Sequence, residues 1–143
     1  MPSEKPQTTE GRHTLRSVGA VLAGIVTNVA PSIATDMALV AAGIYPPLSE
    51  PKAFTTPLLL LATLYRSAYG VLGSYLTARL APDRPMGHAL VLGGIGLAAS
   101  IAGAVAMWDF GPNWYPLALV VLALPGAWAG GRLWMAQAGA RDR

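Results

Sequence analysis

The stretch Met86–Met107 has the sequence MGHALVLGGIGLAASIAGAVAM, with no charged residue after His88. About 20 consecutive apolar residues in a helix are enough to cross the hydrocarbon core of a membrane. Short polar segments that contain proline, Ala81–Pro85 and Asp109–Asn113, bound the stretch on either side. It is therefore predicted to be a transmembrane helix between two tight turns.

The flanking sequence repeats this pattern. Apolar residues also fill the ranges 17–45, 57–80 and 114–134, and Pro46, Pro47 and Pro51 force a loop after the first of them. The polar residues 1–14 are predicted to be a disordered cytoplasmic tail. We expect an all-α membrane protein in which residues 1–143 form a single domain, a bundle of four transmembrane helices at about 17–45, 57–80, 86–107 and 114–134.

Composition supports a membrane protein. The chain is 53% hydrophobic and 12% charged, whereas soluble domains carry about 25% charged residues. Its pI is near 9.6, but the basic residues form no stripe with interleaved aromatic residues, so we expect no nucleic-acid partner. The absence of cysteine excludes disulfides and thiolate metal sites.

The basic residues indicate the orientation. Eight lysines and arginines fall in the first tail, the second turn and the last tail, against a single one, Lys52, in the first loop. Because cytoplasmic segments are enriched in lysine and arginine, both termini are predicted to be cytoplasmic. The eight residues are Lys5, Arg12, Arg16, Arg79, Arg84, Arg132, Arg141 and Arg143.

One alternative concerns the first apolar segment. Arg12 and Arg16, followed by Val18–Val29 and the small residues Ser32–Ala34, also fit a cleaved signal peptide. The apolar run resumes at Met37, and cleavage would leave that part without a partner. This continuation favours an uncleaved span.

Asp36 and Arg66 are ionisable residues within the predicted spans. Such residues are costly in a membrane and mark functional sites by default. Asp36 lies eight residues before Ile44, about 12 Å from the outer end of its helix, and Arg66 lies nine residues after Pro57, about 13 Å from the same end. The matched depths predict an ion pair between the first two helices.

Further polar residues share the faces of this pair. Asn28, Ser32 and Thr35 lie on the side of Asp36, while Tyr69 lies at the margin of the Arg66 face. The possible intramembrane polar site is therefore Asn28, Thr35, Asp36, Arg66 and Tyr69. Two interpretations remain open: a structural pin that fixes helix register, or a proton- or substrate-binding centre where Pro31 breaks the first helix.

Small residues at helical spacing indicate close helix packing. Gly126 and Gly130 form a GxxxG motif, and Gly96, Ser100 and Gly103 share a face of the third helix. We interpret both sets as contacts within the bundle in preference to a dimer interface. Neither histidine has a second metal ligand at a suitable spacing, and no hydrolase or metalloprotease motif occurs, so no metal, cofactor or enzymatic activity is expected.

Several short segments carry a family resemblance. Together they resemble a group of small four-helix membrane proteins of bacteria that have no known activity. The segments are Thr35-Asp36, Tyr45-Pro46-Pro47, Tyr65–Gly70, Thr77–Pro82 and Trp114–Leu119. The resemblance covers about residues 15–133 and implies the bacterial inner membrane as location. The size and the acid in the first helix also resemble small multidrug resistance transporters, but the acid lies past the helix middle and the facing arginine departs from that pattern.

Two functions follow as expectations. The first is a non-enzymatic accessory or partner-binding subunit of the inner membrane, which contacts the lipid bilayer and a second copy or another membrane protein. The second is a small transporter or channel component centred on Asp36 and Arg66.

Overall fold

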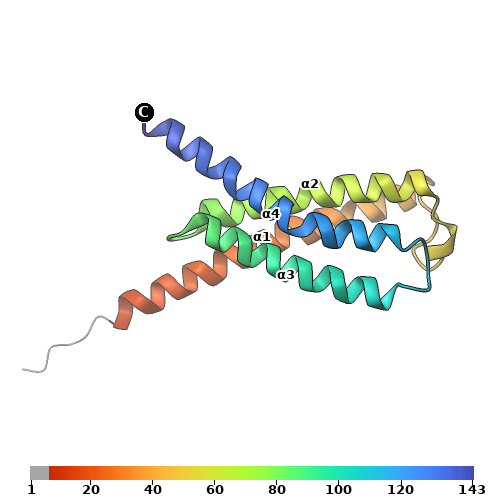
Figure 1. Ribbon diagram of the computed structural model, residues 1–143, viewed down its shortest axis with the longest axis horizontal. Coiled ribbons are helices and arrows are strands. Elements are labelled where there is room, and N and C mark those ends of the chain that lie inside the picture. The colour runs from red at the N-terminus through yellow and green to blue at the C-terminus, as the bar shows by residue number, and fades with distance from the viewer. Residues whose placement is uncertain (1–6) are drawn as a thin grey trace, which may run out of the picture.

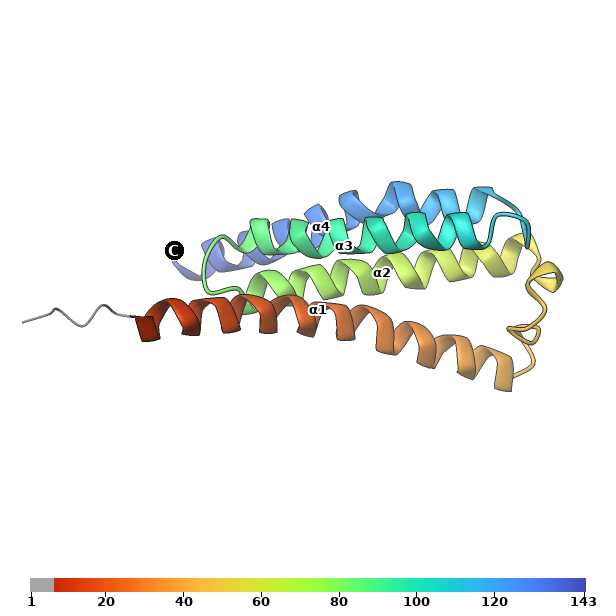
Figure 2. The ribbon, with the colours of Figure 1, turned by 90° about the horizontal axis from the view of Figure 1, so that it is seen from below.

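A computed structural model describes residues 7–143 of the chain. These residues form four long helices that run alternately up and down, so that the α1–α2 and α3–α4 connections lie at one end and the α2–α3 turn at the other (Figures 1 and 2). The start of α1 and the end of α4 lie at the end of the α2–α3 turn. The helices are α1 (Gln7–Ala41), α2 (Thr56–Leu80), α3 (Pro85–Ala106) and α4 (Trp114–Arg141), and a 3-10 turn, η1 (Pro51–Ala53), precedes α2.

Helix α2 is the centre of the bundle, because it packs against each of the other three helices. Helix α4 packs against α2 and α3, whereas α1 packs chiefly against α2 and only slightly against α3. The first helix is therefore held mainly from one side.

Among the described residues, three helices are long and apolar enough to cross a membrane: α1, α3 and α4. Helix α2 has a similar length but contains Arg66 and three tyrosines. Its central position gives those polar groups protein neighbours on three sides. The prediction of an all-helical membrane protein is confirmed at this level.

Helix α1 differs from the prediction at both ends. It begins at Gln7, so the predicted disordered tail is wrong for residues 7–14, where no proline interrupts the helix; residues 1–6 lie outside the described part. It ends at Ala41 and not at 45, because Gly43 adopts a φ of +72°. The amides of Gly43 and Ile44 bond to the carbonyls of Val40 and Leu39 at 3.0 Å each, which is a Schellman cap.

The other helix boundaries agree more closely. Helices α2 and α3 each start within one residue of the predicted position. Helix α4 continues to Arg141 where we expected an end at 134. Its additional turns contact α2, because the Tyr75 hydroxyl donates to Gln137 Oε1 at 2.6 Å and the Tyr75 ring packs edge-on against Trp134.

Small residues bring α2 close to both α1 and α4. A methyl group added at Gly24 would overlap Thr77, and one at Gly130 would overlap the backbone of Val71 and lie 2.8 Å from Ser74 Cβ. The predicted packing role of Gly130 is therefore confirmed. Gly126 makes a looser contact, since its added methyl would lie 3.7 Å from Val71 Cγ2.

The predicted packing face of α3 is wrong. A methyl group added at Gly96 or Gly103 would meet no atom within 4 Å. The close contact with α4 occurs at Gly93, against Ala127, roughly 60° around the helix from Gly96. Gly96, Ser100 and Gly103 instead line a cavity between the helices.

Candidate functional site

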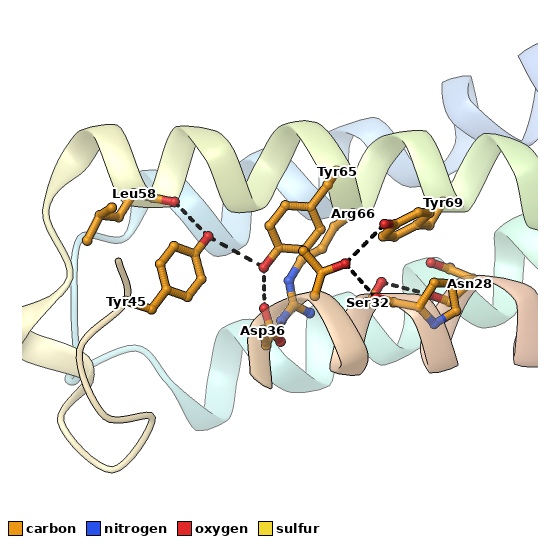
Figure 3. A network of polar contacts seen from close by, with 10 residues as sticks. Asn28, Ser32, Asp36, Tyr45, Leu58, Tyr65, Arg66 and Tyr69 are labelled. Carbon is orange, nitrogen blue, oxygen red and sulfur yellow. Dashed lines mark hydrogen bonds and ion pairs between the residues drawn. The ribbon is translucent and has the colours of Figure 1, made fainter. Parts of the chain in front are cut away.

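The ion pair predicted between the first two helices is present. Arg66 Nη2 on α2 donates to Asp36 Oδ2 on α1 at 2.5 Å (Figure 3). The Asp36 side chain is 12% exposed, whereas the Arg66 side chain is 36% exposed. The carboxylate is thus enclosed between the two helices, and the guanidinium reaches it from a more open position.

Two tyrosines complete the surroundings of the carboxylate. The Tyr65 hydroxyl donates to Asp36 Oδ1, and the Tyr45 hydroxyl lies 3.4 Å from the Tyr65 oxygen and 3.1 Å from the Leu58 carbonyl (Figure 3). Both carboxylate oxygens therefore have a donor. The carboxylate is therefore held from both sides by groups of α2.

Tyr45 closes the network from the α1–α2 loop. Its side chain is 4% exposed and packs edge-on against Phe54, with ring centroids 5.1 Å apart. Sequence reasoning missed Tyr45 and Tyr65. Tyr65 precedes Arg66 directly and so points about 100° away from it on the helix, and Tyr45 lies beyond the end of α1.

A second set of contacts lies nearer the middle of α1. Thr35 Oγ1 is 3.0 Å from the Tyr69 hydroxyl and donates to the Pro31 carbonyl at 2.7 Å. Ser32 Oγ donates to the Asn28 carbonyl at 2.7 Å (Figure 3). Helix α1 continues through Pro31, so the interpretation of this position as a broken point is wrong.

A cavity of about 650 Å³ lies beside the ion pair. Residues of all four helices and of the α1–α2 loop line it. Of the five predicted polar-site residues, Asn28, Asp36 and Arg66 line this cavity, whereas Thr35 and Tyr69 do not. The structure therefore divides the predicted site into a cavity wall and a separate contact between α1 and α2.

Small residues of α3 create much of the space. Gly96, Ser100 and Gly103 present little side-chain volume to the cavity, and Tyr115 and Leu119 of α4 lie across from them. The sequence pattern identified these three residues but assigned them to helix contact, because a stripe of small residues is compatible with either a close neighbour or a void.

The described residues contain no group of three histidines, cysteines or carboxylates able to hold a metal ion. Comparison with family models, curated proteins and solved structures finds no match for the chain. The cavity and the polar groups in its wall are therefore the features of this protein that indicate a function.

We expect the two α1–α2 tyrosine contacts to differ in their effect on stability. Tyr65→Phe removes one of the two donors to a buried carboxylate and should lower the free energy of unfolding by about 1–3 kcal/mol. Tyr69→Phe is the matched control: Thr35 keeps its Pro31 partner, so the loss should stay near 0.5–1 kcal/mol. Unfolding of the purified protein in detergent measures both, and an equal loss would show that Asp36 does not depend on Tyr65.

Proposed function

We propose that the chain is a four-span protein of the bacterial inner membrane with both termini in the cytoplasm. The up-and-down arrangement supports this topology, because α2 lies antiparallel beside α1 along most of its length (Figure 2). Helix α2 has a comparable length and packs against three helices that are each long and apolar enough to span, which supports a fourth span in the same layer. The eight-to-one distribution of basic residues supports the orientation.

Alkaline phosphatase fusions test the topology. Fusions after Asp83 and after Arg143 should be inactive, and fusions after Ser49 and after Gly111 should be active, because the enzyme folds only outside the cytoplasm. The fusions after Ser49 and Asp83 flank α2. Equal activity from these two would show that α2 does not cross the membrane, and the reversed pattern throughout would contradict the orientation.

Within this topology, we propose that the protein is a non-enzymatic binding subunit whose ligand site is the cavity beside Asp36 and Arg66. The cavity carries the proposal. Its volume of about 650 Å³ falls within the range of roughly 300–1,000 Å³ found for small-molecule sites. Such sites combine apolar walls with a few polar groups, and here Arg66, Ser67 and Asn28 stand among apolar residues of α1, α3 and α4.

A transporter or channel component is the second candidate, favoured by the position of Asp36 and Arg66 in the wall of the cavity. Proton coupling would require Asp36 to bind and release a proton. Both of its oxygens already accept hydrogen bonds from Tyr65 and Arg66, so one of these contacts would have to break before a proton could bind there. The geometry therefore supports a binding role ahead of a proton carrier.

Photo-crosslinking in native membranes tests the binding role. A small diazirine amino acid replaces Gly96, which lines the cavity and faces open space. The same amino acid at Gly94, which also has open space but does not line the cavity, is the control. We expect an adduct of defined mass that is at least tenfold enriched at position 96 over position 94, because position 94 meets only the bulk bilayer. Identical adducts at both positions, or none, would contradict a ligand site here.

A flux assay separates the two candidates. Liposomes that contain the purified protein and an internal pH-sensitive dye should show no more proton movement than protein-free liposomes if the role is binding alone. Proton movement that Asp36→Asn abolishes, and that Asp109→Asn at the α3–α4 turn leaves intact, would instead support the transport component.

A further inference from the structure

The cavity opens sideways between α1 and α3. Val29 and Ile33 of α1 and Ile95 of α3 line the cavity, yet they are 46%, 53% and 44% exposed. These two helices have little contact with each other, and α1 diverges from the rest of the bundle toward the end that holds the α1–α2 loop (Figure 2). In the proposed topology this flank lies around the middle of the bilayer, so an acyl chain can reach the cavity without passing through water.

The polar wall offers hydrogen-bond donors in excess of acceptors. A guanidinium carries five N–H groups, and among the described residues that of Arg66 donates to Asp36 and has Tyr115 as a further neighbour, which leaves most of its N–H groups free. Arg66 Nε and the adjacent Ser67 Oγ are buried without a partner. Both oxygens of Asp36 are already occupied. The hydrogen-bond donors at this wall that lack an acceptor therefore favour a ligand rich in oxygen atoms.

Away from Arg66, most of the cavity wall is hydrocarbon. Ile25 of α1, Leu92 of α3, and Leu119 and Leu122 of α4 all contribute to it. A small water-soluble anion would leave these surfaces without a partner. A ligand with an acceptor-rich head and a hydrocarbon chain satisfies both parts of the cavity.

We propose that the cavity binds a membrane phospholipid, with its phosphate on Arg66 and one acyl chain between α1 and α3. Phosphate suits this position because guanidinium groups bind phosphate oxygens through several N–H donors at once. The acyl chain enters through the gap flanked by Val29, Ile33 and Ile95. This inference rests on the proposed binding role and names the class of ligand.

Native mass spectrometry of the full chain in dodecyl maltoside measures the binding of dioleoyl phosphatidylglycerol. Gly96→Leu should weaken binding at least tenfold, because its side chain enters the cavity without meeting another atom. The matched variant Gly94→Leu, whose side chain also meets open space but lies outside the cavity, should bind as the wild type does. Equal binding by the two variants would mean that lipid merely coats the surface, and would overturn the proposal.

Two further probes test the head group and the source of the ligand. Dioleoylglycerol, which has the same chains without phosphate, should bind at least tenfold more weakly than phosphatidylglycerol. The double variant Asp36→Asn, Arg66→Gln leaves no orphan charge and should remove that preference. Equal binding of dioleoylglycerol, or displacement of the phospholipid by water-soluble glycerol phosphate, would each contradict a phospholipid site.

The outcomes for the ligand and for the binding role are distinguishable. A non-lipid adduct at position 96 in the photo-crosslinking experiment would leave the binding role intact and overturn the phospholipid. The absence of any adduct specific to that position would overturn the binding role itself. Specific phosphatidylglycerol binding together with Asp36-dependent proton movement would support the lipid site and contradict a role in binding alone.

Discussion

Arg66 lies in the middle of α2, and much of this structure depends on how its guanidinium obtains a partner in the proposed four-span topology. A lone arginine at the centre of a transmembrane helix costs about 2.5–3.5 kcal/mol even on the mildest scale. Asp36 provides the counter-ion, which requires α1 to lie against α2 in a single register. Tyr65 and Tyr45 then complete the coordination of the carboxylate, which also fixes where the α1–α2 loop packs.

The cavity follows from the same constraint. The ion pair and the contact between Gly24 and Gly73 hold α1 against α2, while α3 and α4 pack against each other and against α2. Few side chains bridge α1 and α3, and the small residues of α3 that face the gap do not fill it. The result is an open pocket beside a charged wall, at the place where α1 leaves the bundle (Figure 2).

The sequence predicted the features that depend on one helix at a time or on depth in the membrane. The α2 and α3 boundaries follow from proline and polar turns, and the contact between Asp36 and Arg66 follows from opposite charge at matched depth. The early end of α1 had a readable signal as well, the glycine at 43, which adopts the left-handed conformation. Its early start had none, because residues 7–14 are polar and include Gly11, although no proline interrupts them.

The missed features depend on three-dimensional neighbours. Gly93 and Gly96 look alike in sequence, yet one touches α4 and the other faces a void, a difference set by the position of α4. Tyr65 reaches Asp36 from beside the polar face of α2, and Tyr45 arrives from a loop. Helical periodicity alone cannot place either side chain.

The coupling energy between Asp36 and Arg66 is the most direct measure of whether this ion pair holds α1 to α2. The free energy of unfolding in detergent is measured for Asp36→Asn, Arg66→Gln and the double variant. Asp36→Asn combined with Arg79→Gln is the control pair, because Arg79 is an exposed residue in the last turn of α2. Each single change at the ion pair should cost about 3 kcal/mol, near the lower end for a broken buried pair. The double variant should cost less than the sum by about 1–3 kcal/mol, whereas the control pair should be additive. Additive losses for Asp36 and Arg66 themselves would contradict the account.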